Sequence, residues 1–344
     1  PFNAVWRINC RYATAASFRP RPGDESHCHL VKPLMQNSMY IVFTSCFKLG
    51  MQINPRLCTH KWTLLIEQLR DRIDCPEFCS RHRHRPTAFT RRRDLTFPIL
   101  LLLLLQKTTR SMQRHLHDFF HRFIEQPAVS AGALTQARAK FSHRAFCELN
   151  QQLLIPAFYS PQAQAAPKQW REHRLLGVDG SQLSLPNHEK VIERFGSIAA
   201  ANKHGVTGSS YVAGRLSVLY DLLNHVGLDA RLEPLSVGEV DIAIEQLSQI
   251  EPEDCVIWDR GFTGYVLMAQ TLEAGANFVG RCSTRSFVAA KKLFKADRAG
   301  CSVVVNVKVP STARAAVKRA KLPRELTVRF VSLRLPDGKL EVLV

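Results

Sequence analysis

The sequence predicts a mixed α/β protein that begins with a bundle of helices. Strand patterns follow one another between residues 174 and 235, and strand and helix patterns then alternate up to residue 280. That order is typical of a mixed sheet covered by helices. Alternating strand patterns return after residue 302, whereas residues 51–155 carry helical patterns joined by short links. We therefore expect two or three domains, which a length of 344 residues allows.

The chain is strongly basic, because 47 Lys and Arg residues outnumber 29 Asp and Glu residues and give a formal charge of +18. Such an excess favours a polyanionic partner over an acidic small molecule. Residues 1–150 hold 23 basic and 10 acidic residues, a net charge of +13, which leaves +5 for the remainder. We therefore expect the front half to make the sequence-independent contacts with phosphate.

The first 155 residues divide into an arm and a helical region. Residues 1–50 show no sustained period, so this N-terminal arm is left unassigned. Apolar residues at helical spacing predict helices over residues 62–72, 97–107, 111–125 and 135–154. The aliphatic run Ile99–Leu105 is far shorter than the roughly 20 residues that span a membrane, and predicts a core helix. The region 51–155 fits a DNA-binding bundle or a dimerising bundle almost equally well.

A basic loop in this region contains six arginines within thirteen positions and no acid. They are Arg81, Arg83, Arg85, Arg91, Arg92 and Arg93. Folded onto one face, they would contact several phosphates, although charge runs are more often solvated, and both interpretations stay open. The nearby set Cys75, Cys79, His82 and His84 departs from the usual spacing of zinc ligands, so a solvated loop is favoured over a zinc site.

Two aspartates are the candidate catalytic residues. Asp179 follows the strand-like run Arg174–Val178 and Asp259 follows Cys255–Trp258, so each is expected where a buried strand ends. Carboxylates at the ends of neighbouring strands are the ligands that Mg²⁺ prefers and that two-metal phosphoryl transfer requires. Each aspartate also precedes a glycine within two positions, so a plain turn cap is an equally good interpretation of the local sequence.

Several other chemistries find no support in the sequence. The phosphate-binding pattern G-x4-G-K-[ST], the dinucleotide pattern G-x-G-x-x-G and the hydrolase pattern G-x-S-x-G are all absent. We therefore expect no nucleotide cofactor. No secretory signal or membrane-spanning segment is recognisable, so no membrane association is expected.

At several places the sequence resembles the insertion-sequence-four family of DDE transposases. The resemblance covers about residues 85–344. The strings that carry it are Leu134–Lys140, Ala145–Asn150, Gly177–Ser181 with Leu185, Pro186, Phe195 and Gly196, Ala213–Leu223, Val256–Phe262 and Leu272–Val279. They occur in the order and spacing of the family, which makes the resemblance more specific than either aspartate alone.

Residues 156–168 lack strong periodicity and carry three prolines, which predicts a linker. The resemblance implies an RNase H-like catalytic core over residues 169–283, followed by a β-rich insertion at 284–344. It also implies that Asp179 and Asp259 are the first two acids of a DDE triad and ligands of Mg²⁺. The family's third acid lies in a Tyr-x2-Arg-x3-Glu-x6-Lys motif that does not occur before Val344. Glu325 and Glu341 lack the companion residues, so no third acid is assigned and the chain is expected to be truncated and inactive.

The resemblance thus implies a transposase of a bacterial insertion sequence. It would bind element-end and target DNA as a homodimer on the nucleoid and catalyse Mg²⁺-dependent cleavage and strand transfer. The alternative is a catalytically silent DNA-binding protein that competes with, or assembles with, an intact transposase.

Overall fold

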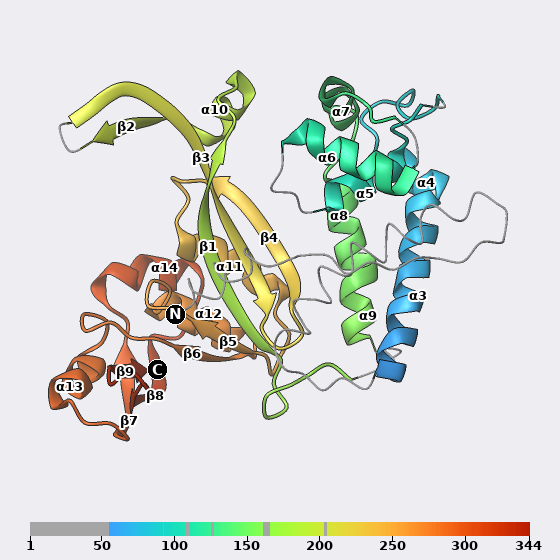
Figure 1. Ribbon diagram of the computed structural model, residues 1–344. Helices are drawn as coiled ribbons and strands as arrows, with labels where there is room; N and C mark the ends of the chain where they lie inside the picture. The colour runs from blue at the N-terminus through green and yellow to red at the C-terminus, as the bar shows by residue number, and fades with distance from the viewer. Residues whose placement is uncertain (1–54, 92, 107–110, 125–126, 161–165, 203–204) are drawn as a thin grey trace. The chain divides into compact units, whose positions relative to one another are not determined.

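The computed structural model describes residues 55–91, 93–106, 111–124, 127–160, 166–202 and 205–344 (Figure 1). The chain divides into two compact units, Pro1–Ala165 and Ala166–Val344. The division falls within the stretch 156–168 that the sequence marks as a linker. The predicted arm at residues 1–50 lies outside the described residues.

Unit 1 is helical in its described part. Its elements are α3 (Pro55–Asp74), α4 (Pro76–His82), α5 (Phe97–Leu105), α6 (Met112–Phe119), η2 (Phe120–Ile124), α7 (Ala131–Arg138), α8 (Arg144–Leu149), η3 (Asn150–Leu154) and α9 (Ile155–Tyr159). The predicted core helix is α5, whose Leu100 and Leu101 are fully buried. The side chain of Thr96 caps α5 by accepting a hydrogen bond from the Ile99 backbone N–H. Within the described part of the chain, no helix is both long and apolar enough to cross a membrane.

The helix predicted over residues 135–154 is interrupted, which corrects the sequence interpretation. The chain turns after α7 because Lys140 and Ser142 leave the helical pattern to pair with the end of α4. The Lys140 carbonyl accepts a hydrogen bond from the His84 N–H at 2.9 Å, and the Ser142 N–H donates to the His82 carbonyl at 2.8 Å. These long-range bonds outweigh local helix propensity. Beyond the turn, helical structure runs from Arg144 to Tyr159.

Unit 2 is built on a mixed sheet. Its elements are β1 (Leu175–Leu185), α10 (Glu189–Phe195), β2 (Ile198–Asn202), β3 (Gly205–Asp221), β4 (Val226–Pro234), α11 (Glu239–Gln246), η4 (Leu247–Gln249), β5 (Cys255–Trp258), α12 (Tyr265–Glu273) and β6 (Asn277–Gly280). Five strands lie in the order β4-β3-β1-β5-β6, with β1, β3 and β4 antiparallel and β1, β5 and β6 parallel. Three antiparallel strands followed by two parallel ones, in this spatial order, form an RNase H-like sheet. The predicted mixed α/β class is confirmed.

A long hairpin extends this sheet. The distal part of β3 pairs with β2, and α10 packs beside β3 at the base of the hairpin (Figure 1). Gly214 makes the packing tight, since a Cβ there would lie 2.9 Å from Leu232 Cδ1 and 3.2 Å from both Leu185 Cδ1 and Phe195 Cε1. Neither α10 nor β2 is predicted by the sequence patterns.

A second, smaller sheet follows in the region predicted as a β-rich insertion. Its strands are β7 (Ser302–Lys308), β8 (Glu325–Arg334) and β9 (Leu340–Leu343). The helix α13 (Val288–Ala296) precedes β7, and η5 (Ser311–Ala313) and α14 (Arg314–Arg319) connect β7 to β8. Phe330 and Val342 pack with residues of α13, α14 and α12 in one core. Backbone hydrogen bonds between Gly280 and Val344 connect β9 to the end of β6. The small sheet is therefore attached to the main sheet at the end of β6, the strand that pairs with β5.

Candidate functional site

Asp179 lies within β1 and not at its end, which corrects the expectation from the sequence. The strand continues because Gly180 is extended and pairs with Ser217 on β3, so the glycine does not provide a turn. The carboxylate is exposed, and its Oδ1 accepts a hydrogen bond from the Gly180 N–H at 2.9 Å. What ends near Asp179 is the pairing of β1 with β5, whose last partners are Gly177 and Ile257.

Asp259 comes directly after β5, as predicted. Its backbone carbonyl closes the following turn by accepting a hydrogen bond from the Phe262 N–H at 2.9 Å. The side chain does not cap that turn. It remains 57% exposed, and its Oδ1 accepts a hydrogen bond from Nη1 of Arg281 at 2.8 Å.

The register of the two strands brings the aspartates to the same level. Gly177 pairs with Ile257 in the parallel β1–β5 ladder, so two further residues along each strand lead to Asp179 and Asp259. Neighbouring strands lie about 4.8 Å apart, and side chains two positions apart point to the same face. Asp179 therefore belongs to the face of β1 opposite that of buried Val178, and exposed Asp259 follows buried Trp258 at the matching position after β5.

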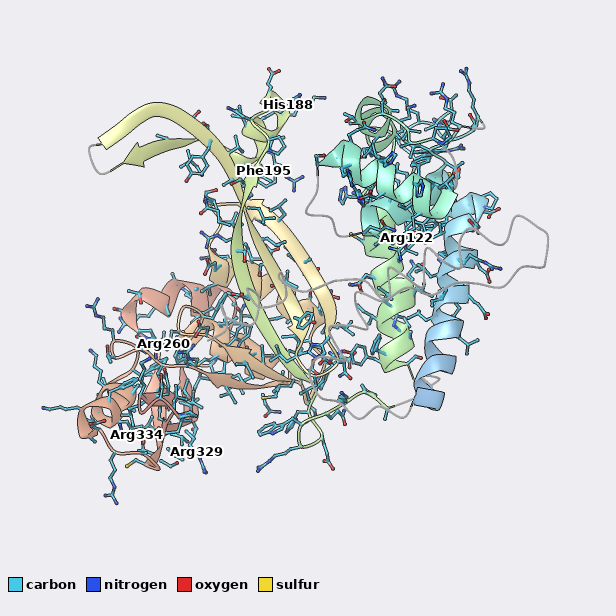
Figure 2. The ribbon with its side chains drawn as sticks, viewed as in Figure 1. Arg122, His188, Phe195, Arg260, Arg329 and Arg334 are labelled. Carbon is cyan, nitrogen blue, oxygen red and sulfur yellow. The ribbon has the colours of Figure 1, made fainter. Side chains whose placement is uncertain are left out.

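An ion-pair network connects Asp259 to the small sheet. Arg281 donates from Nη1 to Asp259 and from Nη2 to Oε1 of Glu341, the latter at 3.2 Å. Arg260, the residue after Asp259, donates to the same Glu341 oxygen (Figure 2 labels Arg260). Two guanidinium groups thus converge on one carboxylate of β9 and flank the second candidate acid.

Glu341 is unusual among the acids of this site because its side chain is only 6% exposed. Burial acts to raise its pKa, but the hydrogen bonds and charges of Arg260 and Arg281 outweigh burial, so the pKa lies below its ordinary value. Its Oε2 is buried and finds no hydrogen-bond partner among the described residues. Sequence reasoning left Glu341 unassigned, and no local pattern signals its proximity to Asp259, since 81 residues separate it from Arg260.

The candidate metal ligands are two carboxylates, which suit a hard cation such as Mg²⁺ but are few in number. Asp179 and Asp259 offer exposed carboxylate oxygens on one face, and Mg²⁺ is commonly held by one or two carboxylates together with water. In the described residues, no three His, Cys, Asp or Glu side chains gather as a metal-binding group. His82, from the set weighed as zinc ligands, is buried and contacts Glu148 at 2.8 Å.

The six arginines of the basic loop have different surroundings. Arg81 is paired with Glu148 at 2.6 Å, and Arg83 donates to the Ala88 carbonyl and the Ser80 hydroxyl. Of the six, Arg85, Arg91 and Arg93 are exposed and form no ion pair with another described residue. Arg92 lies outside the described residues. Their contact with DNA stays a prediction.

The charge of unit 2 is distributed unevenly. Residues 166–283 hold 10 basic and 15 acidic residues, a net charge of −5, whereas residues 284–344 hold 14 basic and four acidic residues, a net charge of +10. The small-sheet region is therefore nearly as basic as the first 150 residues in less than half their length. This basic region is hidden when residues 151–344 are counted together, because their net charge of +5 is the sum of −5 and +10.

No protein-family model matches the chain, and no curated protein matches it. Among solved structures it is similar to the piggyBac transposase, determined by cryo-EM in a synaptic complex with hairpin DNA, at a TM-score of 0.40 and 13% identity. The match covers 79% of this chain and 59% of that chain. This chain thus spans less than two thirds of the length of that transposase.

Proposed function

We propose that this chain is a transposase-type protein that binds the DNA ends of a bacterial insertion element and acts on their phosphodiester bonds. The chief support is the register of β1 and β5, which leads to Asp179 and Asp259 at one level of an RNase H-like sheet. The resemblance to insertion-sequence-four transposases concerns the same two aspartates. The basic charge of the chain suits a nucleic-acid partner.

In this proposal Asp179 and Asp259 hold the metal. Bound Mg²⁺ would supply Lewis-acid stabilisation of the attacking and leaving oxygens. Arg281 would release Asp259 when the metal binds. Its ion pair with Glu341 would keep the Arg281 guanidinium beside the site, where its positive charge would face the phosphate. Arg260 would supply a second positive charge from the turn after β5. The resemblance suggests cleavage by water followed by attack of the free 3′ hydroxyl on target DNA.

The experiment that tests this function is a nicking assay on supercoiled DNA carrying element ends, with Mg²⁺ and with EDTA. The proposed enzyme nicks only with Mg²⁺, and Asp179→Ala and Asp259→Ala each abolish nicking. Cleavage that survives both substitutions would remove the aspartates from the mechanism.

A second function is favoured by a specific observation. The described residues bring no third acidic or imidazole ligand to the two aspartates, and an arginine neutralises one of them. A catalytically silent protein that binds element ends and competes with an active transposase fits this arrangement. DNA binding without nicking at any divalent-metal concentration, together with inhibition of an active relative, would favour it.

A further inference from the structure

The strongest cluster of cations in the described part of unit 2 lies on and after α14. Five basic residues and no acid occur between residues 314 and 324. We call them the α14 basic segment, which consists of Arg314, Lys318, Arg319, Lys321 and Arg324. All five are exposed.

The segment is held to the protein by its apolar residues. Val317 and Leu322 are buried in the core that α14 shares with the small sheet. The Tyr265 hydroxyl of α12 donates a hydrogen bond to the Pro323 carbonyl at 2.8 Å, and the Val309 N–H donates to the Arg324 carbonyl at 3.1 Å. Because these anchors face inward, the charged side chains between them must face solvent.

The positive charge of the segment is not neutralised within the described residues. None of its five side chains forms an ion pair there. The next acid in the sequence, Glu325, lies directly opposite Lys308 across the β7–β8 pair. Arg314 and Lys318 are four residues apart in the sequence and lie on one face of α14. Like charges fixed together create a local field that attracts a polyanion.

We propose that the α14 basic segment is a binding site for the phosphate backbone of duplex DNA. The site is separate from the basic loop of unit 1 and reads no base sequence, since lysine and arginine contacts with phosphate fix position without specifying bases. The choice of DNA among polyanions rests on the proposed function. A duplex presents one charge per roughly 1.7 Å of its axis, which allows several neighbouring cations to be used at once.

The test measures binding of the full-length chain to random-sequence duplex DNA by fluorescence anisotropy in EDTA over a range of salt concentrations. The variant is Lys318→Glu, Arg319→Glu and Arg324→Glu together. We expect at least about a tenfold loss of affinity near 0.1 M salt, and a salt slope lower in magnitude by about 2 to 3, because each lost phosphate contact removes about 0.9.

The matched control reverses three charges on the other helix of the same region, through Lys291→Glu, Lys292→Glu and Lys295→Glu. These lysines of α13 are also exposed, so the change in net charge is equal. A smaller loss in the control supports a localised site. An equal loss in both variants would mean that only net charge matters, and no loss in the α14 variant would also overturn the proposal.

Two further measurements keep the result interpretable. Thermal unfolding checks that the α14 variant folds, and the milder set Lys318→Gln, Arg319→Gln and Arg324→Gln replaces it if it does not. Binding to vesicles of phosphatidylserine and phosphatidylcholine is compared in parallel, and a loss confined to vesicles would overturn the assignment to DNA. Because EDTA removes metal chemistry, this outcome is independent of nicking, so failure of the binding site and failure of the proposed function are distinguishable.

Discussion

The backbone and the side chain of Asp259 make different contacts. Its backbone carbonyl closes the turn after β5, while its carboxylate faces solvent and accepts a hydrogen bond from Arg281. A cap of the following turn would have used the side chain. The exposed carboxylate is therefore free to exchange the guanidinium for another cation.

Removal of Arg281 should strengthen metal binding at Asp259. In Arg281→Ala, the Oδ1 atom loses its competing partner, and we expect Mn²⁺, a spectroscopic substitute for Mg²⁺, to bind about two- to fivefold more tightly, in keeping with the ~1 kcal/mol or less of an exposed ion pair. Electron paramagnetic resonance titration measures this. The control Arg260→Ala removes a nearby charge whose ion pair is with Glu341. An effect no larger in Arg281→Ala than in Arg260→Ala would show that Arg281 does not compete with metal.

In unit 1, Glu148 is a mostly buried carboxylate that pairs with Arg72, Arg81 and His82. Hydrogen bonds first from Arg81 and then from His82 lower the pKa of its carboxyl to about 2, and burial only partly opposes them. Glu148→Gln should cost about 2–3 kcal/mol of unfolding free energy, because charged hydrogen bonds to a mostly buried group are lost. Urea unfolding measures it. Exposed Glu67→Gln is the control, with an expected change within about 0.5 kcal/mol.

The same pKa sets a pH dependence. Because the folded-state pKa of Glu148 is lowered from 4.5, its ionised form favours the folded chain. That contribution is fully present above about pH 4.5 and is lost as the pH falls toward 2. The difference in stability between wild type and Glu148→Gln should therefore shrink over this interval. A difference that stays constant would contradict the assigned ion pairs.

Among the elements, β3 and α10 depend on one glycine. In Gly214→Ala the new methyl group would lie 2.9 Å from Leu232 Cδ1, and backbone or side chains must shift. We expect a loss of about 1–3 kcal/mol in unfolding free energy, typical of overpacking. Gly227→Ala on β4 is the matched control, since no atom lies within 4 Å of its added Cβ. Equal urea midpoints for both variants would show that the contact at Gly214 is relaxed without cost.

The elements also show how far sequence reasoning reaches. Buried runs such as Cys255–Trp258 and the apolar helix at Phe97–Leu105 are predicted closely, because composition alone requires their burial. The break after α7 and the continuation of β1 beyond Asp179 are not, because hydrogen bonds to residues far along the chain decide both. The meeting of Glu341 with Arg260 and Arg281 depends likewise on the attachment of β9 to the end of β6.

For the whole molecule, charge is concentrated in two regions of the sequence. Residues 1–150 carry +13 and residues 284–344 carry +10, with the acidic stretch 151–283 between them. The acidic stretch includes the two candidate metal ligands. The two basic regions suit binding of a polyanion, and the acidic stretch between them suits binding of a metal cation.

The basic loop of unit 1 should contribute to DNA binding through its exposed members. Replacing Arg85, Arg91 and Arg93 by Ala should lower the magnitude of the salt slope by about 2 to 3. Alanine at Arg138, Lys140 and Arg144 is the control of equal charge in the same unit. Anisotropy titrations that give one slope for both triples would assign the loop to solvent.

Metal binding at Asp179 and Asp259 tests the central claim most directly, because it does not require that the chain be catalytically active. Mn²⁺ is titrated into the full-length protein and into Asp179→Ala and Asp259→Ala, with Asp229→Ala, an acid of β4 paired with Arg231, as the control. We predict that wild type and Asp229→Ala bind Mn²⁺ alike and that each of the other two variants loses binding at this site. Unchanged Mn²⁺ binding in both Asp179→Ala and Asp259→Ala would contradict the account.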